Sequence, residues 1–503
     1  MAKARISFVS KPSLRRSLAN GLMLNLLGNL LLYLGHLIIA RRLPREDYAT
    51  FTVVVSFVSL MALFADLGLT LLFVRKFAAA EALAEAGNKD TRGELLGSML
   101  ALRFGMAIFI SIVVLVLTPI LGYSLETRQL IMIMLVTLFI SSRLMVVRSV
   151  GEAFLRGHNK YHLVALFAVV DALVFAGALY FYSDKILDLE GAVWIYSFCH
   201  IPGFLLLCGI IYRFGKSIDF KLKLDFQIIK GMLIEGFPLI LSTAFLTIHS
   251  QADALLIDKL SSAKEVSAYG AGMRVLTAII FLPAVFSAVI GPSVTQATVT
   301  QDFEKMRPMI ERSFRILLLI ALFIAVSFSI SSHFIVNILL GTNKYLDAAP
   351  LVMIFAWTFI PICFGTFITD IAIAEGRFWI PALYTAILMV VSILSDIILI
   401  PQYGALGAVI AKCIAVTIGS LTLLFISEKL HVLRRNSLLL IFLKLGMIAA
   451  CSLGIIYVLS LFQLNLIVVI SIVSLTFFLT AILLSMCSFE IWVSPFKFFS
   501  RTL

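Results

Sequence analysis

Residues 94–118 read ELLGSMLALRFGMAIFISIVVLVLT, an apolar run that contains a single cation, Arg103, well inside it. An α-helix rises about 1.5 Å per residue, so about 20 apolar residues cross the roughly 30 Å hydrocarbon core of a bilayer. The run is long enough to do so. It therefore predicts a membrane-spanning helix, and it places a charged residue within the membrane.

Runs of the same kind occupy most of the chain. Hydrophobic residues make up 61% of the 503 residues, charged residues make up 14%, and the mean hydropathy is +1.06. This composition is far from the usual soluble mixture. We count about fourteen candidate spans, at residues 17–40, 48–74, 94–118, 130–150, 161–182, 191–212, 230–257, 266–294, 312–340, 347–373, 378–400, 404–426, 438–461 and 464–487. The sequence therefore predicts an all-α polytopic membrane protein with about fourteen transmembrane helices.

The positions of the basic residues indicate a topology. A net charge of +12 would suggest a nucleic-acid partner if the basic residues formed one patch. Instead, with the N-terminus placed in the cytoplasm, about 26 of the 40 Lys and Arg residues fall in cytoplasmic segments and about 8 in external loops. We therefore expect both termini in the cytoplasm and no nucleic-acid partner.

Motifs that carry enzyme chemistry are missing from the sequence. The six cysteines fall in apolar spans without a C-x-x-C pair, and no histidine has metal-ligand spacing. The sequence contains no G-x-x-x-x-G-K-[ST] phosphate loop and no G-x-S-x-G or H-E-x-x-H motif. External loops of roughly a dozen residues or fewer leave little room for a catalytic domain. We expect a transporter without a cofactor or metal rather than an enzyme.

Three pairs of segments indicate an internal repeat, at offsets of about 216 to 219 residues. They are LIIARRLPREDYATF from Leu37 with LLIDKLSSAKEVSAYG from Leu255, FLRGHNKYHLVALF around Gly157 with AIAEGRFWIPALY around Gly376, and LEGAVWIYSF near Gly191 with ALGAVIAKCI near Gly407. Six spans per repeat return the chain to its starting side, which predicts two six-helix lobes in a parallel pseudo-twofold repeat. We place the lobes at residues 1–216 and 217–430, and two additional helices at 431–503.

Several stretches carry a family resemblance. RRSLANGLMLNLLGNLLLYLGHLIIARRLPREDYATF from Arg15, EGFPLILSTAFLTIHSQADALLI from Glu235, SAYGAGMRVL from Ser267 and LIPQYGALGAVIA from Leu399 resemble the Wzx-type polysaccharide and O-antigen flippases. These belong to the multidrug, oligosaccharidyl-lipid and polysaccharide (MOP) exporter superfamily. The resemblance covers roughly residues 15–430. One departure is Arg45, which stands where family members commonly carry a glycine.

The resemblance implies a MATE-like fold in the cytoplasmic (inner) membrane. It implies a flippase that moves a polyprenyl-pyrophosphate-linked glycan by alternating access, for the biosynthesis of a surface polysaccharide such as O-antigen or exopolysaccharide. The implied partners are this lipid-linked glycan, membrane lipids, and polymerase or other glycan-assembly proteins. Three alternatives stay open: a MATE-like ion-coupled multidrug or metabolite antiporter, a membrane enzyme of glycan assembly, and a scaffold for such enzymes.

Three cations inside predicted spans are candidate contacts for an anionic head group. Arg103, Arg274 and Lys412 each lie about eight or nine residues from a span end, where a charge costs about 2.5 to 3.5 kcal/mol. Arginine suits bidentate phosphate binding, and lysine offers a point charge. In the alternative interpretation each cation only neutralises a carboxylate of similar depth, Asp66 for Arg103 and Asp253 or Asp396 for Arg274 and Lys412.

Two helical faces carry polar residues. In the first span Asn25, Asn29, Tyr33 and His36 recur at helical spacing, and in the seventh span Ser242, His249 and Asp253 do the same. We expect both faces to line a central cleft, with Asn25, Asn29, His36 and His249 contacting the substrate. Hydrogen bonding between helices would explain such faces equally well.

Asp171 lies near the middle of the fifth predicted span, without a cation at an obviously matching depth. We therefore predict that it is an ion-coupling site for a proton or sodium, with Asp66 and Asp253 as further candidates. A hydrogen-bonded packing aspartate is the alternative. Pro238 is the expected hinge, because proline frees a backbone carbonyl and allows a kink.

Overall fold

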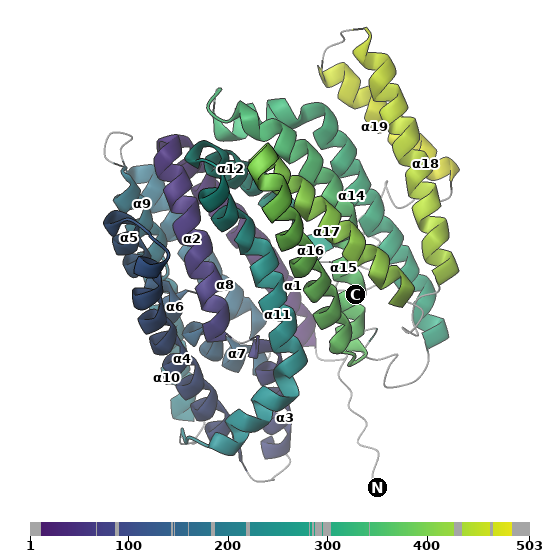
Figure 1. Cartoon of the computed structure of the whole chain (residues 1–503). Coiled ribbons are helices and arrows are strands. Elements are labelled where there is room, and N and C mark those ends of the chain that lie inside the picture. The colour runs from purple at the N-terminus through teal and green to yellow at the C-terminus, as the bar shows by residue number, and fades with distance from the viewer. Residues whose placement is uncertain are drawn as a thin grey trace. The chain divides into compact units, whose positions relative to one another are not determined.

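The computed structural model describes residues 12–484 except 67, 86–89, 142, 143, 145, 159, 183–186, 218–221, 281, 284, 285, 287–293, 295–302, 342, 427–434 and 463–465. Within the described residues the chain forms α-helices and one short 3₁₀ helix, without a β-strand (Figure 1). Two compact units are formed. Unit 1 comprises Met1–Leu43 and Phe57–Ile240, and unit 2 comprises Pro44–Ser56 and Leu241–Leu503.

Unit 1 consists of α1 (Pro12–Arg42), the second part of α2 (Arg45–Asp66), α3 (Thr70–Glu85), α4 (Arg92–Ile120), α5 (Leu125–Leu135), α6 (Thr137–Ile140), α7 (Val147–Gly157), α8 (Tyr161–Phe181), α9 (Leu189–Phe198), α10 (Ile201–Ser217) and the first part of α11 (Phe226–Leu260). Both α2 and α11 contribute residues to each unit. Pro238, the expected hinge, lies within α11 close to the point where the helix passes from unit 1 to unit 2.

Unit 2 contains the first part of α2 and the second part of α11. Its other elements are α12 (Ala263–Ile280), α14 (Phe303–Leu340), the 3₁₀ helix η1 (Leu346–Ala348), α15 (Ala349–Ala374), α16 (Trp379–Tyr403), α17 (Ala405–Ile426), α18 (Arg435–Ser460) and α19 (Leu466–Leu483). Buried aromatic and aliphatic side chains of α14, α15 and α18, such as Phe314, Phe364 and Ile448, form a continuous core in this unit.

The expected polytopic all-α fold is confirmed. In the described part, 11 helices are long and apolar enough to cross a membrane. Each of the roughly fourteen spans expected from the sequence coincides with at least one helix. Three of the expected spans are not among these 11 helices. The fourth is divided between α5 and α6, the eighth corresponds to α12, and the last corresponds to the shorter helix α19.

The second expected span, residues 48–74, ends earlier than predicted. Helix α2 stops at Asp66, and a turn containing Gly68 precedes α3, which begins at Thr70. Gly68 has a φ of 59°, a left-handed conformation that glycine adopts without a steric penalty. The Gly68 amide also donates to Asp66 Oδ2 (3.2 Å). The apolar pattern runs through this turn, and so hydropathy alone could not place the boundary.

Helix α1 packs against α8 along three glycines. Gly21, Gly28 and Gly35 recur every seven residues on one face of α1, and a Cβ atom added there would meet Tyr161, Val169 and Phe175 of α8, respectively. Small residues allow two membrane helices to approach closely. The glycines therefore decide which face of α1 is buried in unit 1, and the polar residues of α1 are placed relative to that face.

Helices α16 and α17 form a hairpin that depends on the motif LIPQYGALGAVIA. Gly404 ends α16 with φ 56° and ψ −133°, a backbone conformation that only glycine adopts readily. Gly407 lies in the first turn of α17, and a Cβ atom there would collide with the backbone of Leu399 and Ile400. The glycine of this motif is therefore needed for steric reasons, because α16 and α17 can approach each other this closely only where α17 carries no side chain.

Gly407→Ala is expected to destabilise unit 2 by about 1–3 kcal/mol, because the added methyl group must push α16 and α17 apart. The measurement is the thermal unfolding midpoint of the protein in detergent. Gly446→Ala in α18 is the matched control, since its Cβ would meet no heavy atom within 4 Å. Equal midpoints for the two variants would contradict the steric explanation.

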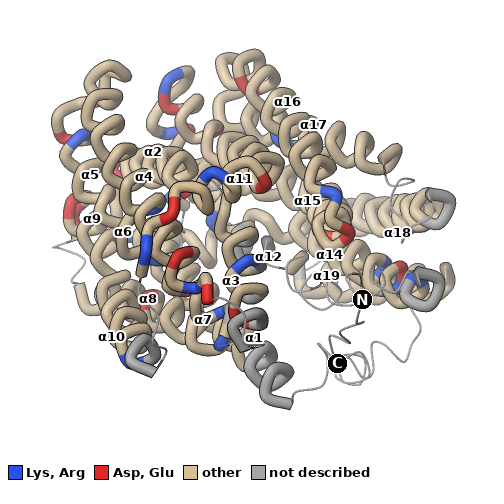
Figure 2. The backbone as a smooth tube through the Cα atoms, turned by 90° about the horizontal axis from the view of Figure 1, so that it is seen from below, with Lys and Arg blue, Asp and Glu red and all other residues tan. Residues whose placement is uncertain are grey.

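The surface of the helices is that of an integral, multi-pass membrane protein. Most of the helical backbone carries uncharged residues, and charged ones are sparse along it (Figure 2). Large apolar side chains are exposed, for example Phe109 (57%) and Ile112 (56%) on α4 and Leu443 (67%) on α18. Such contiguous apolar exposure is unfavourable in water and favourable against lipid tails.

Candidate functional site

The buried Lys, Arg, Asp and Glu side chains of the described part gather in three clusters. Arg103 centres the first and Arg148 the second, both in unit 1, and Lys412 centres the third, in unit 2. Each cation pairs with a carboxylate at 2.7 Å or less. A buried charge is tolerated when it is paired and hydrogen-bonded, so the partners define what each cluster does.

Arg103 of α4 binds the end of α2. Its Nη1 lies 2.5 Å from Asp66 Oδ1 and donates to the carbonyl oxygens of Ala65 (3.3 Å) and Asp66, while its Nη2 donates to Thr70 Oγ1 (3.0 Å). Only 1% of the Arg103 side chain is exposed. A guanidinium has five N–H groups in a fixed fork, so it can bind a carboxylate and free carbonyls together.

The expected ion pair between Asp66 and Arg103 is therefore confirmed. Arg103 binds the carbonyls that the C-terminus of α2 leaves without intrahelical partners, and Asp66 also accepts from Gly68 and Thr70 in the following turn. The cluster fixes the α2–α3 corner against α4. Arg103 Nε has no hydrogen-bond partner within the described residues, and contact of Arg103 with a substrate stays a prediction.

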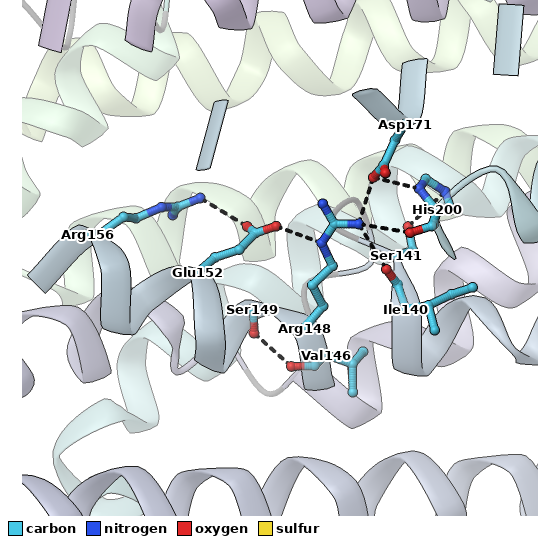
Figure 3. Close-up of polar contacts among 9 residues, drawn as sticks. All are labelled: Ile140, Ser141, Val146, Arg148, Ser149, Glu152, Arg156, Asp171 and His200. Atoms are coloured by element: carbon cyan, nitrogen blue, oxygen red, sulfur yellow. Dashed lines mark hydrogen bonds and ion pairs between the residues drawn. The ribbon is translucent and has the colours of Figure 1, made fainter. Parts of the chain in front are cut away.

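The second cluster contains a cation that the sequence analysis missed. Asp171, which was expected to lack a cationic partner, pairs with Arg148 of α7: Arg148 Nη1 lies 2.7 Å from Asp171 Oδ2, and Arg148 Nε donates to Glu152 Oε1 at 3.0 Å (Figure 3). His200 Nδ1 also contacts Asp171 Oδ2, at 3.1 Å. The expectation of an unpaired Asp171 was wrong because α6 ends at Ile140, so Arg148 is not at the end of a continuous span.

The third cluster joins three helices of unit 2. Lys412 Nζ on α17 lies 2.6 Å from Asp253 Oδ2 on α11, and the same carboxylate oxygen accepts the hydroxyl of Tyr269 on α12. Asp396 on α16 lies within hydrogen-bonding reach of Asp253 and accepts from Ser392 Oγ (3.4 Å). The expected pairing of Lys412 with Asp253 is confirmed.

Charge is not balanced among these buried groups of unit 2. Asp253 and Asp396 are both 0% exposed and Lys412 is 4% exposed, so two carboxylates face one ammonium group. One oxygen of each carboxylate has no hydrogen-bond partner within the described residues. Two adjacent carboxylates cannot both ionise cheaply in a low-dielectric site. The arrangement is therefore able to hold one further positive charge, a proton or a metal cation.

Arg274 of α12 differs from the other two expected cations. It is half-buried, and its guanidinium lies near the buried hydroxyl of Tyr48 on α2. No carboxylate forms an ion pair with Arg274 in the part of the chain that the structure describes. Of the three predicted head-group contacts, Arg274 therefore keeps the most capacity to bind an added anion.

The polar face of α1 is divided rather than uniform. Asn25 and Asn29 are exposed, whereas His36 is 5% exposed and packs against Phe175 and Tyr196, with ring centroids 5.5 and 5.7 Å apart. The prediction that all these residues share an open face is wrong for His36, because the neighbouring Gly35 draws α1 onto α8.

The polar face of α11 is also engaged within unit 2. His249 is 5% exposed, and its carbonyl oxygen accepts from Lys412 Nζ (3.4 Å). Ser242 Oγ accepts from Thr385 Oγ1 of α16 (3.5 Å). These contacts favour the interpretation of hydrogen bonding between helices for this face. Substrate contact by Asn25, Asn29, His36 and His249 stays a prediction.

Among the described residues, no group of three or more His, Cys, Asp or Glu side chains has the arrangement of a metal site. The five cysteines that are described form no disulfide with one another, and Cys487 lies outside the described residues.

Comparison with known proteins places this fold in a family. The family model described as Polysaccharide biosynthesis protein matches residues 14–298, and the MatE family model matches residues 238–398. A search of curated protein sequences found no match to the chain. The first family match spans more than half of the sequence, and it includes the clusters around Arg103 and Arg148.

Solved structures share the fold at low sequence identity. The structure titled lipid II flippase MurJ, inward closed conformation, has a TM-score of 0.70 and 17% identity, over 92% of this chain and 97% of that one. An inward-facing multidrug resistance MATE family transporter of the MOP superfamily has a TM-score of 0.64 and 17% identity, over 80% and 95%. The structure of the MATE multidrug transporter DinF-BH has a TM-score of 0.62 and 13% sequence identity, over 84% of this chain and 96% of that one.

These likenesses concern the fold alone, whereas the family match concerns the sequence. Together they account for the helical architecture, the exposed apolar surface and the stretches quoted from both halves of the chain. The protein is an integral membrane protein with a MATE-like all-α fold, and it belongs to the polysaccharide biosynthesis protein family within the MOP exporter superfamily.

Proposed function

We propose that this protein is a flippase that moves a lipid-linked oligosaccharide, a glycan unit on polyprenyl pyrophosphate, from the cytoplasmic to the outer leaflet of the cytoplasmic membrane by alternating access. The observation that carries the proposal is the polysaccharide biosynthesis family match over residues 14–298 on a MATE-like fold. The sequence resemblance to Wzx-type flippases supports the same substrate. Both termini would face the cytoplasm, and a polymerase would use the translocated unit.

Electrostatics supports an anionic substrate. A pyrophosphate head group needs cations and hydrogen-bond donors at membrane depth, because a polar head without partners costs several kcal/mol in hydrocarbon. Arg274 is half-buried without a carboxylate partner among the described residues. We propose it as the primary head-group contact. Arg103 and Lys412 stay proposed head-group contacts, although each is paired with a carboxylate in this structure, and Asn25 and Asn29 would contact the sugar.

The substrate is tested in a strain that lacks the gene. We expect the lipid-linked intermediate to accumulate in the cytoplasmic leaflet, and re-expression of this chain to restore surface polysaccharide. Extraction of the accumulated lipid and analysis of its head group identify the substrate. Accumulation in the outer leaflet would contradict a flippase and would indicate a later step of assembly.

Arg274→Ala is expected to reduce polysaccharide export at least about tenfold at normal protein level, because loss of one charge-assisted contact to phosphate costs about 1.5–3 kcal/mol. Export is measured as surface polysaccharide per cell, with membrane protein level determined in the same cells. Arg315→Ala on α14 is the matched control, since Arg315 is also half-buried in unit 2 and contacts only the Glu311 carbonyl in the described part. Full export by Arg274→Ala would remove Arg274 from the proposal.

We propose that ion coupling uses Asp253. Of the three predicted coupling residues, Asp66 pairs with Arg103, and Asp171 pairs with Arg148 and contacts His200. Asp253 and Asp396, in contrast, have only Lys412 as a nearby cation in the described part. Proteoliposomes with and without an imposed proton or sodium gradient test the proposal. Translocation that is indifferent to both gradients would exclude coupling at any of the three residues.

A multidrug or metabolite antiporter is the second candidate. The MatE match over residues 238–398 favours it, and it covers the unit 2 carboxylates that could neutralise a cationic substrate. Growth of an expressing strain in the presence of cationic drugs distinguishes the candidates. Increased resistance without an effect on surface polysaccharide would support the antiporter over the flippase.

A further inference from the structure

Two membrane segments of unit 1 are interrupted. In the fourth expected span α6 ends at Ile140, before the separate helix α7 begins at Val147, and in the sixth α9 ends at Phe198 and α10 begins at Ile201. A break frees backbone carbonyls that lipid cannot satisfy, so breaks persist at membrane depth only where protein groups bind them. The identity of those groups therefore shows what holds the broken segments in place.

One guanidinium binds both breaks. Arg148 Nη1 donates to the carbonyl oxygen of Ile140 (3.1 Å), which ends α6, and lies 3.4 Å from that of His200, between α9 and α10, which also accepts the Phe204 amide (3.0 Å). The same nitrogen binds Asp171 on α8 (2.7 Å) (Figure 3). The Arg148 side chain is 0% exposed. Arg148 therefore connects α8, the fifth span, with the end of α6 in the fourth span and with the turn between α9 and α10 in the sixth.

The imidazole of His200 adds a second connection across the same break. Its Nδ1 faces Asp171 Oδ2 (3.1 Å), and its Nε2 faces the hydroxyl oxygen of Ser141 (3.2 Å). An ionised carboxylate only accepts, so Nδ1 is the protonated nitrogen of the neutral ring. Nε2 then accepts from the Ser141 hydroxyl. Because a hydroxyl both donates and accepts, Nε2 can take up a proton while the heavy atoms stay in place.

The charged groups around His200 are balanced when its ring is neutral. Helix α7 contributes Arg148, Glu152 and Arg156, which form a chain of ion pairs, and α8 contributes Asp171. The ring of Tyr196 on α9 lies 6.5 Å from that of His200, and the thiol of Cys208 on α10 lies near Arg148. Two arginines thus face two carboxylates, and a proton on His200 adds one positive charge beside Asp171.

Close packing keeps Asp171 at the break. A Cβ atom at Gly203 of α10 would collide with Asp171 Oδ1 and with the carbonyl oxygen of Phe167. Helix α10 therefore approaches α8 closely just after the interruption, next to Pro202. Asp171 Oδ1 has no hydrogen-bond partner within the described residues, so the attachment of α8 at this point uses Oδ2 alone.

We infer that Arg148, Asp171 and His200 form a latch that holds the broken sixth segment to α7 and α8, and that His200 is a proton-binding site which tightens this latch. The imidazolium donates a charge-assisted hydrogen bond to Asp171, which is roughly twice as strong as the neutral one. The inference concerns the conformation of unit 1 and does not use the transport proposal.

Amide hydrogen exchange in residues 189–205 tests the latch directly. The full-length protein in detergent is measured between pH 5.5 and 8.0, with rates corrected for the intrinsic pH dependence of exchange. We expect the protection of this segment to fall about tenfold as the pH rises. Residues 104–118 of α4 contain no titratable side chain and serve as the internal reference. A pH-independent protection of the wild-type segment would overturn the inference without any variant.

His200→Gln keeps hydrogen bonding without titration, and it is expected to give low protection that does not change with pH. Asp171→Asn removes the charge that attracts the proton, and it is expected to flatten the profile in the same way. His333→Gln on α14, where the histidine is exposed, is the matched control and keeps the wild-type profile. A pH dependence that survives in His200→Gln would overturn the assignment of the proton to His200. Transport is not measured, so failure of the flippase proposal leaves the result unchanged.

Discussion

Arg148→Leu is expected to destabilise unit 1 by about 3–5 kcal/mol, because it leaves Glu152 and Asp171 buried without their shared cation. The Glu152 and Asp171 side chains are 4% and 2% exposed, and Arg148 binds both within 3.0 Å. The same change removes the hydrogen bond to the Ile140 carbonyl at the end of α6. The measurement is the thermal unfolding midpoint of the purified protein in detergent.

Arg156→Leu is the control for this prediction. Arg156 pairs with the same Glu152 at 3.4 Å, but 31% of its side chain is exposed. A pair that is partly open to solvent contributes only about 0–1 kcal/mol. The two variants remove the same charge from positions two turns apart on α7, so similar midpoints would contradict the view that the buried Arg148 holds this part of unit 1 together.

The sequence was sufficient to predict the fold class. Spans longer than about 20 apolar residues have few structural alternatives, since lipid-exposed backbone must be hydrogen-bonded internally. The same reasoning predicted the pair between Arg103 and Asp66, because both lie at similar depths on long helices. Lys412 and Asp253 were also predicted correctly, for the same reason.

Depth arguments failed where the helices are interrupted. The distance of a residue from a span end gives its depth only when the helix is continuous. The fourth segment is not continuous, because α6 ends at Ile140 and α7 begins at Val147. Arg148 was therefore not considered as a partner, and Asp171 seemed to lack a cation. Pro202, two residues after His200, was the available sequence signal, since proline removes a backbone donor and favours helix starts.

The polar face of α1 shows a second limit of sequence reasoning. Helical spacing correctly groups Asn25, Asn29 and His36, but a face about 100° wide contains positions that pack and positions that do not. The glycines at 28 and 35 decide the outcome by drawing α1 onto α8. A regular spacing of small residues is thus as informative as the polar residues themselves, and it indicates which of them are buried.

Lys412→Leu is expected to destabilise unit 2 by about 3–5 kcal/mol. In the described part of the unit, this lysine forms the ion pair with Asp253 and is the cation nearest Asp396. The thermal unfolding midpoint measures the loss, as for Arg148. The double variant Lys412→Leu, Asp253→Asn is expected to recover most of it, since the remaining Asp396 no longer faces a second negative charge.

The two variants separate a structural role of Lys412 from a transport role. Recovery of stability in the double variant without recovery of export means that the charged groups are needed for the transport cycle and not only for folding. Recovery of both stability and export means that the Lys412 cluster serves only to stabilise unit 2, and that ion coupling uses other residues. A double variant as unstable as Lys412→Leu alone would contradict the charge imbalance itself, because the cost would then come from the lost lysine stem rather than from unpaired carboxylates.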